Sequence, residues 1–313
     1  MAMNFWEQQS KARSLTTFYL ILFILLTVAT AVIVEIALRS FAEAQYNPPL
    51  PLVGGAFILV TLAVAAFNYV MYKQHGGSYV AESVGAQRVD INSSHPRERQ
   101  LVNIVQEMAL ATSLPLPAIY IIPSQEINAF AAGLKKDNAA IAISAGALER
   151  LNRDEVQAVI AHEFGHIYNG DMVISLRLAA MVIGFFFVLY IGFRLLQIAS
   201  FRRGGDRQGG GAVMAIAALA FIAAGALAWF IGSILKATVS RQREYLADAC
   251  GVQFTRNPLA LANALRKIAK DPARDMPKTG SAFSHMYLED HASIFATHPP
   301  IAKRIAALEG TDK

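Results

Sequence analysis

Two histidines four residues apart, with a glutamate after the first, are the residues of this sequence best suited to chemistry. They are His162, Glu163 and His166, in a segment that begins near Asn152 and has apolar residues at helical spacing. Asn152 can cap such a helix, because Glu155 three residues later can reach back to it. Both imidazoles then project from one helical face and can bind one metal ion. Glu163 lies beside that ion as a general base that can hold a water molecule.

The alternative interpretation of so short a pattern is two surface histidines and a solvated glutamate. A second pair favours the metal site, because Glu244 and Asp248 are also four residues apart and share a helical face. Glu244 offers a third ligand, and Asp248 can orient a ligand imidazole through its other N–H group. Alone, this pair is equally consistent with a solvated acidic face. Together the two patterns predict one Zn²⁺ per chain, bound by His162, His166 and Glu244 with one position open for water.

Four apolar runs must position these residues. The length of each is close to the roughly 20 residues that a helix needs to span a bilayer. The predicted transmembrane helices are residues 14–38, 52–72, 173–193 and 211–235. The first is interpreted as an uncleaved anchor, because its uncharged stretch, residues 14–34, is followed by Glu35 and Arg39 instead of a cleavage site of small residues. The third is the weakest, and it spans only if the arginines at its two ends snorkel. The alternative for the third and fourth runs is a buried helical hairpin in a soluble domain.

Two polar segments, 73–172 and 236–313, carry the two halves of the predicted site. Because both halves must bind one ion, the chain between His166 and Glu244 crosses the bilayer either twice or not at all. Basic residues such as Lys73 and Lys236 beside the apolar runs place both termini and both polar segments in the cytoplasm. The arginines around Arg202, between the third and fourth runs, argue against that orientation.

The composition also favours a membrane protein. Hydrophobic residues make up 54% of the chain and charged residues 16%, against about 25% charged in typical soluble domains. The net charge of +5 comes without a recognised nucleic-acid-binding module, so nucleic acid is excluded as a partner. The single cysteine, Cys250, excludes an intrachain disulfide framework and fits a reducing compartment. The predicted fold class is α+β, mainly α: a polytopic membrane protein with four hydrophobic helices and a cytoplasmic, zincin-like metalloprotease domain.

Upstream of the histidine helix the sequence predicts a β-hairpin. Residues 128–133 and 140–144 are largely apolar and flank a polar, turn-like stretch. We expect an exposed edge that can pair with an extended substrate, because main-chain pairing recognises extended polypeptide. The alternative is an ordinary structural hairpin, and both interpretations can hold together.

The sequence resembles the membrane metalloproteases of the heat-shock protease HtpX family, which are related to the CAAX prenyl proteases. Four motifs in the same order carry the resemblance, and they cover residues 127–131, 162–171, 243–248 and 297–305. The resemblance implies zinc ligands at His162, His166 and Glu244, with Glu163 as the general base. It also places Asp248 and Arg304 around the ligands, His298 near the reacting carbonyl, and Asn128, Ala129 and Phe130 on the substrate-binding edge. From the residues alone, His298 would be interpreted as a loop histidine before two prolines.

The predicted function is that of a membrane-embedded zinc metalloendopeptidase. In such a site zinc supplies Lewis-acid activation, and Glu163 moves a proton from water to the leaving amine. Glu244 follows the fourth run by nine residues, about 13 Å of helix, which favours membrane proteins and unfolded polypeptides as substrates. The resemblance implies quality control of misfolded or damaged membrane proteins in the stress response, at the inner membrane of a bacterium.

The alternatives are a CAAX-type prenyl protease and a non-catalytic membrane sensor. Four runs are too few for the prenyl-protease branch of the resemblance, and an intact Glu163 is unnecessary in a sensor.

Overall fold

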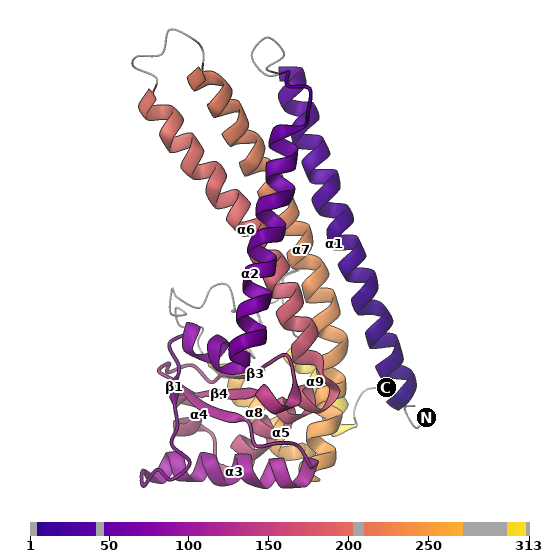
Figure 1. The fold of residues 1–313 in the computed structure, drawn as a ribbon. Helices are drawn as coiled ribbons and strands as arrows, with labels where there is room; N and C mark the ends of the chain where they lie inside the picture. Colours follow the sequence, from indigo (N-terminus) through magenta and orange to yellow (C-terminus); the bar gives the residue numbers. More distant parts are fainter. Residues whose placement is uncertain (1–4, 42–46, 203–209, 272–298, 311–313) are drawn as a thin grey trace. The chain divides into compact units, whose positions relative to one another are not determined.

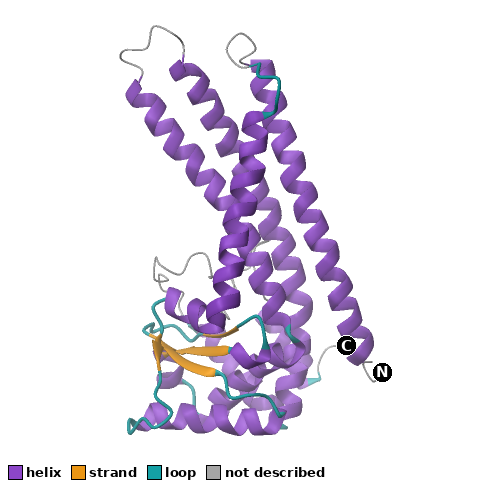
Figure 2. Cartoon of the chain, in the orientation of Figure 1, coloured by secondary structure: helices purple, strands orange, loops and turns teal. Residues whose placement is uncertain are grey.

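The computed structural model describes residues 5–41, 47–202, 210–271 and 299–310. Over these residues the chain is mainly helical and contains one small sheet (Figures 1 and 2). Two compact units divide it. We call Met1–Tyr69 with Leu178–Leu235 the helical unit, and Val70–Arg177 with Lys236–Lys313 the mixed unit.

Four long helices supply the helical unit, and three of them also extend into the mixed unit. Their bounds are α1 (Phe5–Phe41), α2 (Leu52–Ser83), α6 (Asp171–Arg202) and α7 (Gly210–Thr255). Each contains a stretch that is long and apolar enough to cross a membrane: Ile21–Ser40, Leu52–Ser83, Asp171–Ser200 and Met214–Ile234. The third stretch has 30 residues, because the helix continues past Arg194, where the apolar run in the sequence ends.

The acidic group at the end of the first apolar stretch is buried within the helical unit. Glu35 accepts a hydrogen bond from the Arg39 Nε–H at 2.9 Å and another from the Gly54 N–H, in the first turn of α2, at 3.0 Å. A Cβ atom at Gly54 would lie 2.8 Å from the Ala31 carbonyl oxygen. Glycine therefore allows α1 and α2 the close approach at which Glu35 reaches a free N–H group of a helix N-terminus.

The mixed unit contains the sheet, in the order β1-β2-β4-β3. Its strands are β1 (Gln87–Arg88), β2 (Ala118–Ile122), β3 (Ala129–Ala132) and β4 (Ala140–Ser144). The helices of this unit are α3 (Pro96–Thr112), α4 (Ala145–Arg150), α5 (Arg153–Asn169), α8 (Pro258–Lys270) and α9 (Ile301–Glu309), with a short 3₁₀ turn at Lys136–Asn138. Helix α5 is central, since it packs on α3, on α8 and on β3.

The predicted hairpin is present, because β3 pairs antiparallel with β4. The Ser144 N–H donates to the Asn128 carbonyl at 2.8 Å, so these two residues form a hydrogen-bonded pair. Such pairs alternate along an antiparallel ladder. Phe130 and Ala132 therefore bond to β4, while Ala129 and Ala131 direct their N–H and C=O groups to the other side of β3. No strand among the described residues pairs with that side.

The expectation of an exposed edge is wrong. All four residues of β3 are buried, from 0% exposure for Ala129 to 7% for Ala131. Helix α5 packs on the strand, and Gly77 approaches its far end so closely that a Cβ there would lie 2.1 Å from the Ala132 carbonyl oxygen. The small alanine side chains of β3 permit this close packing.

Candidate metal centre

Helix α5 presents the two histidines, and its start is built as the sequence predicts. The Asn152 Oδ1 atom accepts the Glu155 N–H at 2.9 Å, and the Glu155 carboxylate accepts the Asn152 N–H at 2.8 Å. This reciprocal capping satisfies two N–H groups at the start of the helix. The helix ends at Gly170, whose positive φ of 73° closes the last turn.

His162, His166 and Glu244 form the one group of potential metal ligands found among the described residues. One donor atom from each lies within 4.8 Å of the other two. The Nε2 atom of His162 is 3.5 Å from Glu244 Oε2, and the Nε2 atom of His166 is 3.4 Å from Glu244 Oε1. Two ligands at about 2.0–2.1 Å from a tetrahedral zinc ion are about 3.3–3.4 Å apart. The donor set therefore fits a zinc ion in its chemistry, and these two spacings are close to those of tetrahedral ligands.

Small residues bring Glu244 on α7 to the histidines on α5. A Cβ atom at Gly165 would lie 3.0 Å from the Ala247 Cα, and one at Gly251 would lie 3.2 Å from the His162 backbone nitrogen. The backbones of the two helices can therefore approach closely. Helical spacing alone does not show which glycines face a second helix, so the sequence analysis missed this contact.

His162 is oriented by a buried aspartate that is bound in turn by an arginine. The Nδ1 atom of His162 is 2.8 Å from Asp248 Oδ1. Arg304 of α9 donates to both oxygens of Asp248, from Nε at 2.8 Å and from Nη2 at 2.7 Å, and its Nη1 atom lies 3.3 Å from Glu244. Burial acts to raise the pKa of Asp248, but the charge of Arg304 and the contact with His162 outweigh it and lower that pKa to about 2.

His166 has a similar pair of neighbours, which the sequence analysis did not assign. The Nδ1 atom of His166 is 3.4 Å from Asp171 Oδ2, and Arg243 lies 3.5 Å from the other carboxylate oxygen. Arg243 also donates to the Asp171 carbonyl at 3.3 Å. Asp171 begins α6, directly after Gly170. Its position five residues after His166, within the motif 162–171, was the available signal.

The charges buried around the site support the same fit. Glu163, Asp171, Glu244 and Asp248 are at most 4% exposed, and Arg243 and Arg304 are at most 8% exposed. With neutral histidines, four carboxylates and two guanidinium groups leave two negative charges. Buried charges are paired or bind metals in folded proteins, and a divalent cation would balance this set.

The remaining predicted residues lie partly on β3 and partly outside the described chain. Asn128 is 1% exposed, and its N–H donates to the Ser144 Oγ atom at 2.9 Å. Ala129 and Phe130 belong to β3, which packs on α5. His298 lies outside the described residues.

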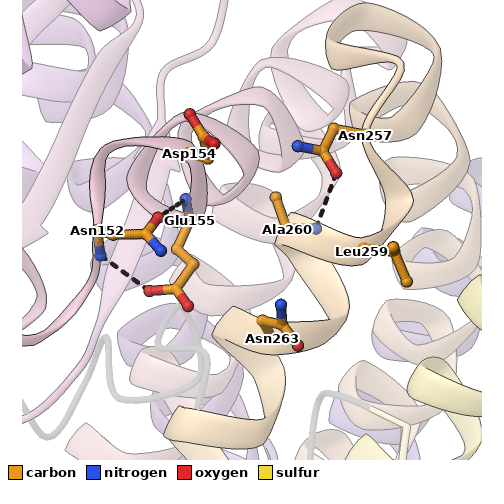
Figure 3. A pocket seen from close by; sticks show the side chains of 7 residues that line it. All are labelled: Asn152, Asp154, Glu155, Asn257, Leu259, Ala260 and Asn263. Carbon is orange, nitrogen blue, oxygen red and sulfur yellow. Dashed lines mark hydrogen bonds between the residues drawn. The ribbon is translucent and has the colours of Figure 1, made fainter.

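A separate pocket of about 230 Å³ lies where the first turns of α5 and α8 meet (Figure 3). Three of its polar residues are already engaged in helix capping, since Asn152 and Glu155 cap α5 and the Asn257 Oδ1 atom accepts the Ala260 N–H at 3.1 Å. None of the three potential metal ligands lines this pocket.

Comparison with known proteins shows the family of the chain. Peptidase family M48 matches residues 95–312, more than two thirds of the chain. The chain belongs to peptidase family M48. A protease HtpX homolog from Bacteroides fragilis strain YCH46 is 34% identical over 269 residues, which cover 82% of this chain and 79% of that protein. Another from Thermoanaerobacter pseudethanolicus is 34% identical over 264 residues, which cover 80% of this chain and 83% of that protein.

Among solved structures, Ste24p from S. mikatae aligns with 93% of this chain and 66% of its own chain, at 18% identity and a TM-score of 0.48. The family and the four apolar helices identify this M48 protein as a multi-pass membrane metalloprotease of the HtpX type.

Proposed function

We propose that this protein is a zinc-dependent endopeptidase in which His162, His166 and Glu244 bind the metal and Glu163 is the general base. The observation that carries the proposal is the convergence of the three donor atoms within 4.8 Å of one another. Glu163 follows His162 on the same helix and is 3% exposed. The arrangement corresponds to an HExxH helix with a third ligand from an ExxxD helix.

The choice of zinc among divalent metals is supported by the ligand set. Two imidazoles and one carboxylate are typical of catalytic zinc sites, which keep one position open. When bound there, zinc supplies Lewis-acid polarisation of a carbonyl and activation of a water molecule. The two excess negative charges of the buried cluster suit a divalent rather than a monovalent cation.

Other side chains are assigned the proton transfer, the orientation of the imidazoles and the stabilisation of the oxyanion. Glu163 accepts a proton from the attacking water and delivers it to the leaving amine. Asp248 and Asp171 orient the imidazoles of His162 and His166 from the Nδ1 side. We also assign to His298 the role of an additional hydrogen-bond donor to the developing oxyanion.

We propose that the substrate binds as an extended strand along β3. The outward backbone groups of Ala129 and Ala131 have no partner strand among the described residues. Because β3 is buried, the substrate must displace whatever covers this side. Unpaired backbone groups in a buried position are costly, which supports pairing with a further strand when substrate is bound. Side-chain specificity would then be loose, since the pairing uses backbone groups.

For the substrate class, we propose misfolded or damaged membrane proteins and unfolded polypeptides, cut on the cytoplasmic side of the inner membrane. Support comes from the chain itself, since the apolar stretch that ends at Ile234 and the ligand Glu244 belong to one helix, α7. Quality control of the membrane follows from this choice of substrate. The orientation rests on the basic residues beside the apolar helices.

The decisive experiment compares wild-type protein with Glu163→Gln, both purified in detergent. We expect Glu163→Gln to keep one zinc ion per chain by metal analysis and to lose at least about a thousandfold in kcat on unfolded casein and on a misfolded membrane protein. Full activity in this variant would exclude Glu163 as the base.

A farnesylated peptide with a CAAX C-terminus serves as a third substrate. We expect no preference for it, whereas cleavage of this peptide alone would favour a prenyl protease.

A further inference from the structure

The backbone leading into β3 is held by side chains from elements far away in the sequence. The Ser144 hydroxyl accepts the Asn128 N–H at 2.9 Å and donates to the Glu126 carbonyl. The Gly146 N–H donates to the Ser124 carbonyl at 2.9 Å. These contacts come from the end of β4 and the start of α4, so they join the lead-in segment, residues 124–128, to the neighbouring strand.

Asp271 adds a contact from the opposite direction. It follows the last residue of α8, and one of its carboxylate oxygens accepts the Ile127 N–H at 2.9 Å. The same oxygen accepts a hydrogen bond from Arg150 Nη2, also at 2.9 Å, and the other oxygen binds Arg150 Nη1. Arg150 also donates to the Gln125 carbonyl. A bidentate guanidinium–carboxylate pair has a defined geometry, and here both of its members bind the lead-in segment.

The same group of side chains reaches the start of the metal-binding helix. Lys267 of α8 donates to the Arg150 carbonyl at 3.0 Å and to the Glu155 carboxylate at 2.6 Å. Glu155 is the residue that completes the capping of α5. A continuous set of contacts therefore links the beginning of β3 to the beginning of α5.

We propose that Asp271 and Arg150 are positioning residues that set β3 against α5 and so set the register in which a substrate backbone pairs with Ala129 and Ala131. The proposal rests on the proposed function of β3 as the substrate-binding strand. Ile127 precedes Ala129 by two residues, so a shift at its N–H is passed directly to the pairing groups. A slip of one residue would turn every side chain of a paired strand to the other face.

The expected signature is a change in substrate binding with little change in chemistry. None of the metal ligands, nor Glu163, contacts Asp271 or Arg150 in the described interactions. Loss of Asp271 should therefore raise KM and leave zinc content and kcat close to wild type. A residue with a merely structural role would instead lower the active fraction, and with it kcat, at constant KM.

The experiment uses full-length protein in detergent with three variants. Asp271→Ala removes both contacts, Asp271→Asn keeps an acceptor oxygen but loses the charge, and Arg150→Lys keeps a charge without the bidentate pair. The matched control is Glu107→Ala, which removes the contacts of Glu107 with Arg153 and Gln157 of α5 but does not involve β3. KM and kcat are measured on an unfolded peptide, with zinc content, thermal unfolding and hydrogen exchange on the same samples.

We expect Asp271→Ala to raise KM about tenfold and Asp271→Asn and Arg150→Lys about threefold, with kcat within about twofold of wild type. Deuterium uptake should rise in residues 123–132 and stay unchanged in residues 118–122 of β2. Glu107→Ala should change neither quantity.

Two results would overturn the proposal: unchanged KM and exchange in Asp271→Ala, or a fall in kcat and zinc content at constant KM. If Asp271→Ala fails to fold, Asp271→Asn and Arg150→Lys decide by the same criteria. Failure of the proposed function would look different, because the wild-type protein would then cleave no peptide. In that case the exchange measurement still decides whether Asp271 holds β3.

Discussion

The two histidines that we propose as metal ligands are each held by an aspartate and an arginine, but the contacts differ in length. His162 contacts Asp248, which Arg304 binds in turn, and these contacts are 2.7–2.8 Å long. Arg304 is 0% exposed. His166 contacts Asp171, which Arg243 binds in turn, and these contacts are 3.3–3.5 Å long. We call these the His162 arm and the His166 arm.

The difference between the arms follows from where their aspartates lie in the sequence. Asp171 is five residues from His166, so the end of α5 already places it near the imidazole. Asp248 is 86 residues from His162, and it is held in place by a bidentate contact from Arg304 on α9. Asp248, which is distant in sequence, therefore depends on its pairing with Arg304 for its position. Asp171 is already placed near His166 by the end of α5.

Replacing the two arginines should give the largest difference between the arms, in the free energy of unfolding. We expect Arg304→Met to cost about 3–5 kcal/mol of unfolding free energy, because it leaves the buried Asp248 carboxylate without its charged partner. Arg243→Met should cost about 1 kcal/mol, since its contacts are longer. Thermal and denaturant unfolding of purified protein measure both values. Equal losses in the two variants would show that the arms do not differ in strength.

Replacing the two aspartates should give a smaller difference between the arms, in the affinity for zinc. We expect Asp248→Asn to weaken zinc affinity about 100-fold and Asp171→Asn about tenfold, the upper and lower ends for residues that orient metal ligands. Competition with a fluorescent chelator measures the two dissociation constants. Glu107→Ala is the control for a carboxylate whose contacts are with Arg153 and Gln157 and not with the candidate ligands. A larger effect in Asp171→Asn than in Asp248→Asn would reverse our ranking.

Removing the metal should have the smallest and most local effect. Chelation removes the ion that the three candidate ligands share, and we expect hydrogen exchange to increase more around His166 and Asp171 than around Asp248 and Arg304. The bidentate pair of the His162 arm should persist without metal. Mass-spectrometric hydrogen exchange with and without chelator tests this, with uptake in α3 as the internal control. Equal increases in both arms would contradict it.

Local features of the site could be predicted from the sequence because they depend on spacing within one helix. The capping of α5 by Asn152 and Glu155, the shared face of His162 and His166, and the hairpin at β3 are of this kind. Arg304 entered only through the family resemblance, since nothing in its local sequence indicates a partner in α7.

The missed features depend on contacts between elements that are distant in the chain. Close packing at Gly165 and Gly251 brings α7 to α5, and only the folded structure shows that these glycines face another helix. The burial of β3 was missed for the same reason, because alternation along a strand does not reveal what covers its edge. The parallel pairing of β2 with β4 also joins segments that no short pattern connects.

The order of the ligands along the chain has a consequence for biosynthesis. His162 and His166 leave the ribosome together, but Glu244 follows His166 by 78 residues and Arg304 follows Glu244 by another 60. At about 5–20 residues per second, translation needs several further seconds to supply them. The two apolar helices α6 and α7 are made within that interval. A nascent chain therefore has no complete candidate metal site until these helices have been synthesised.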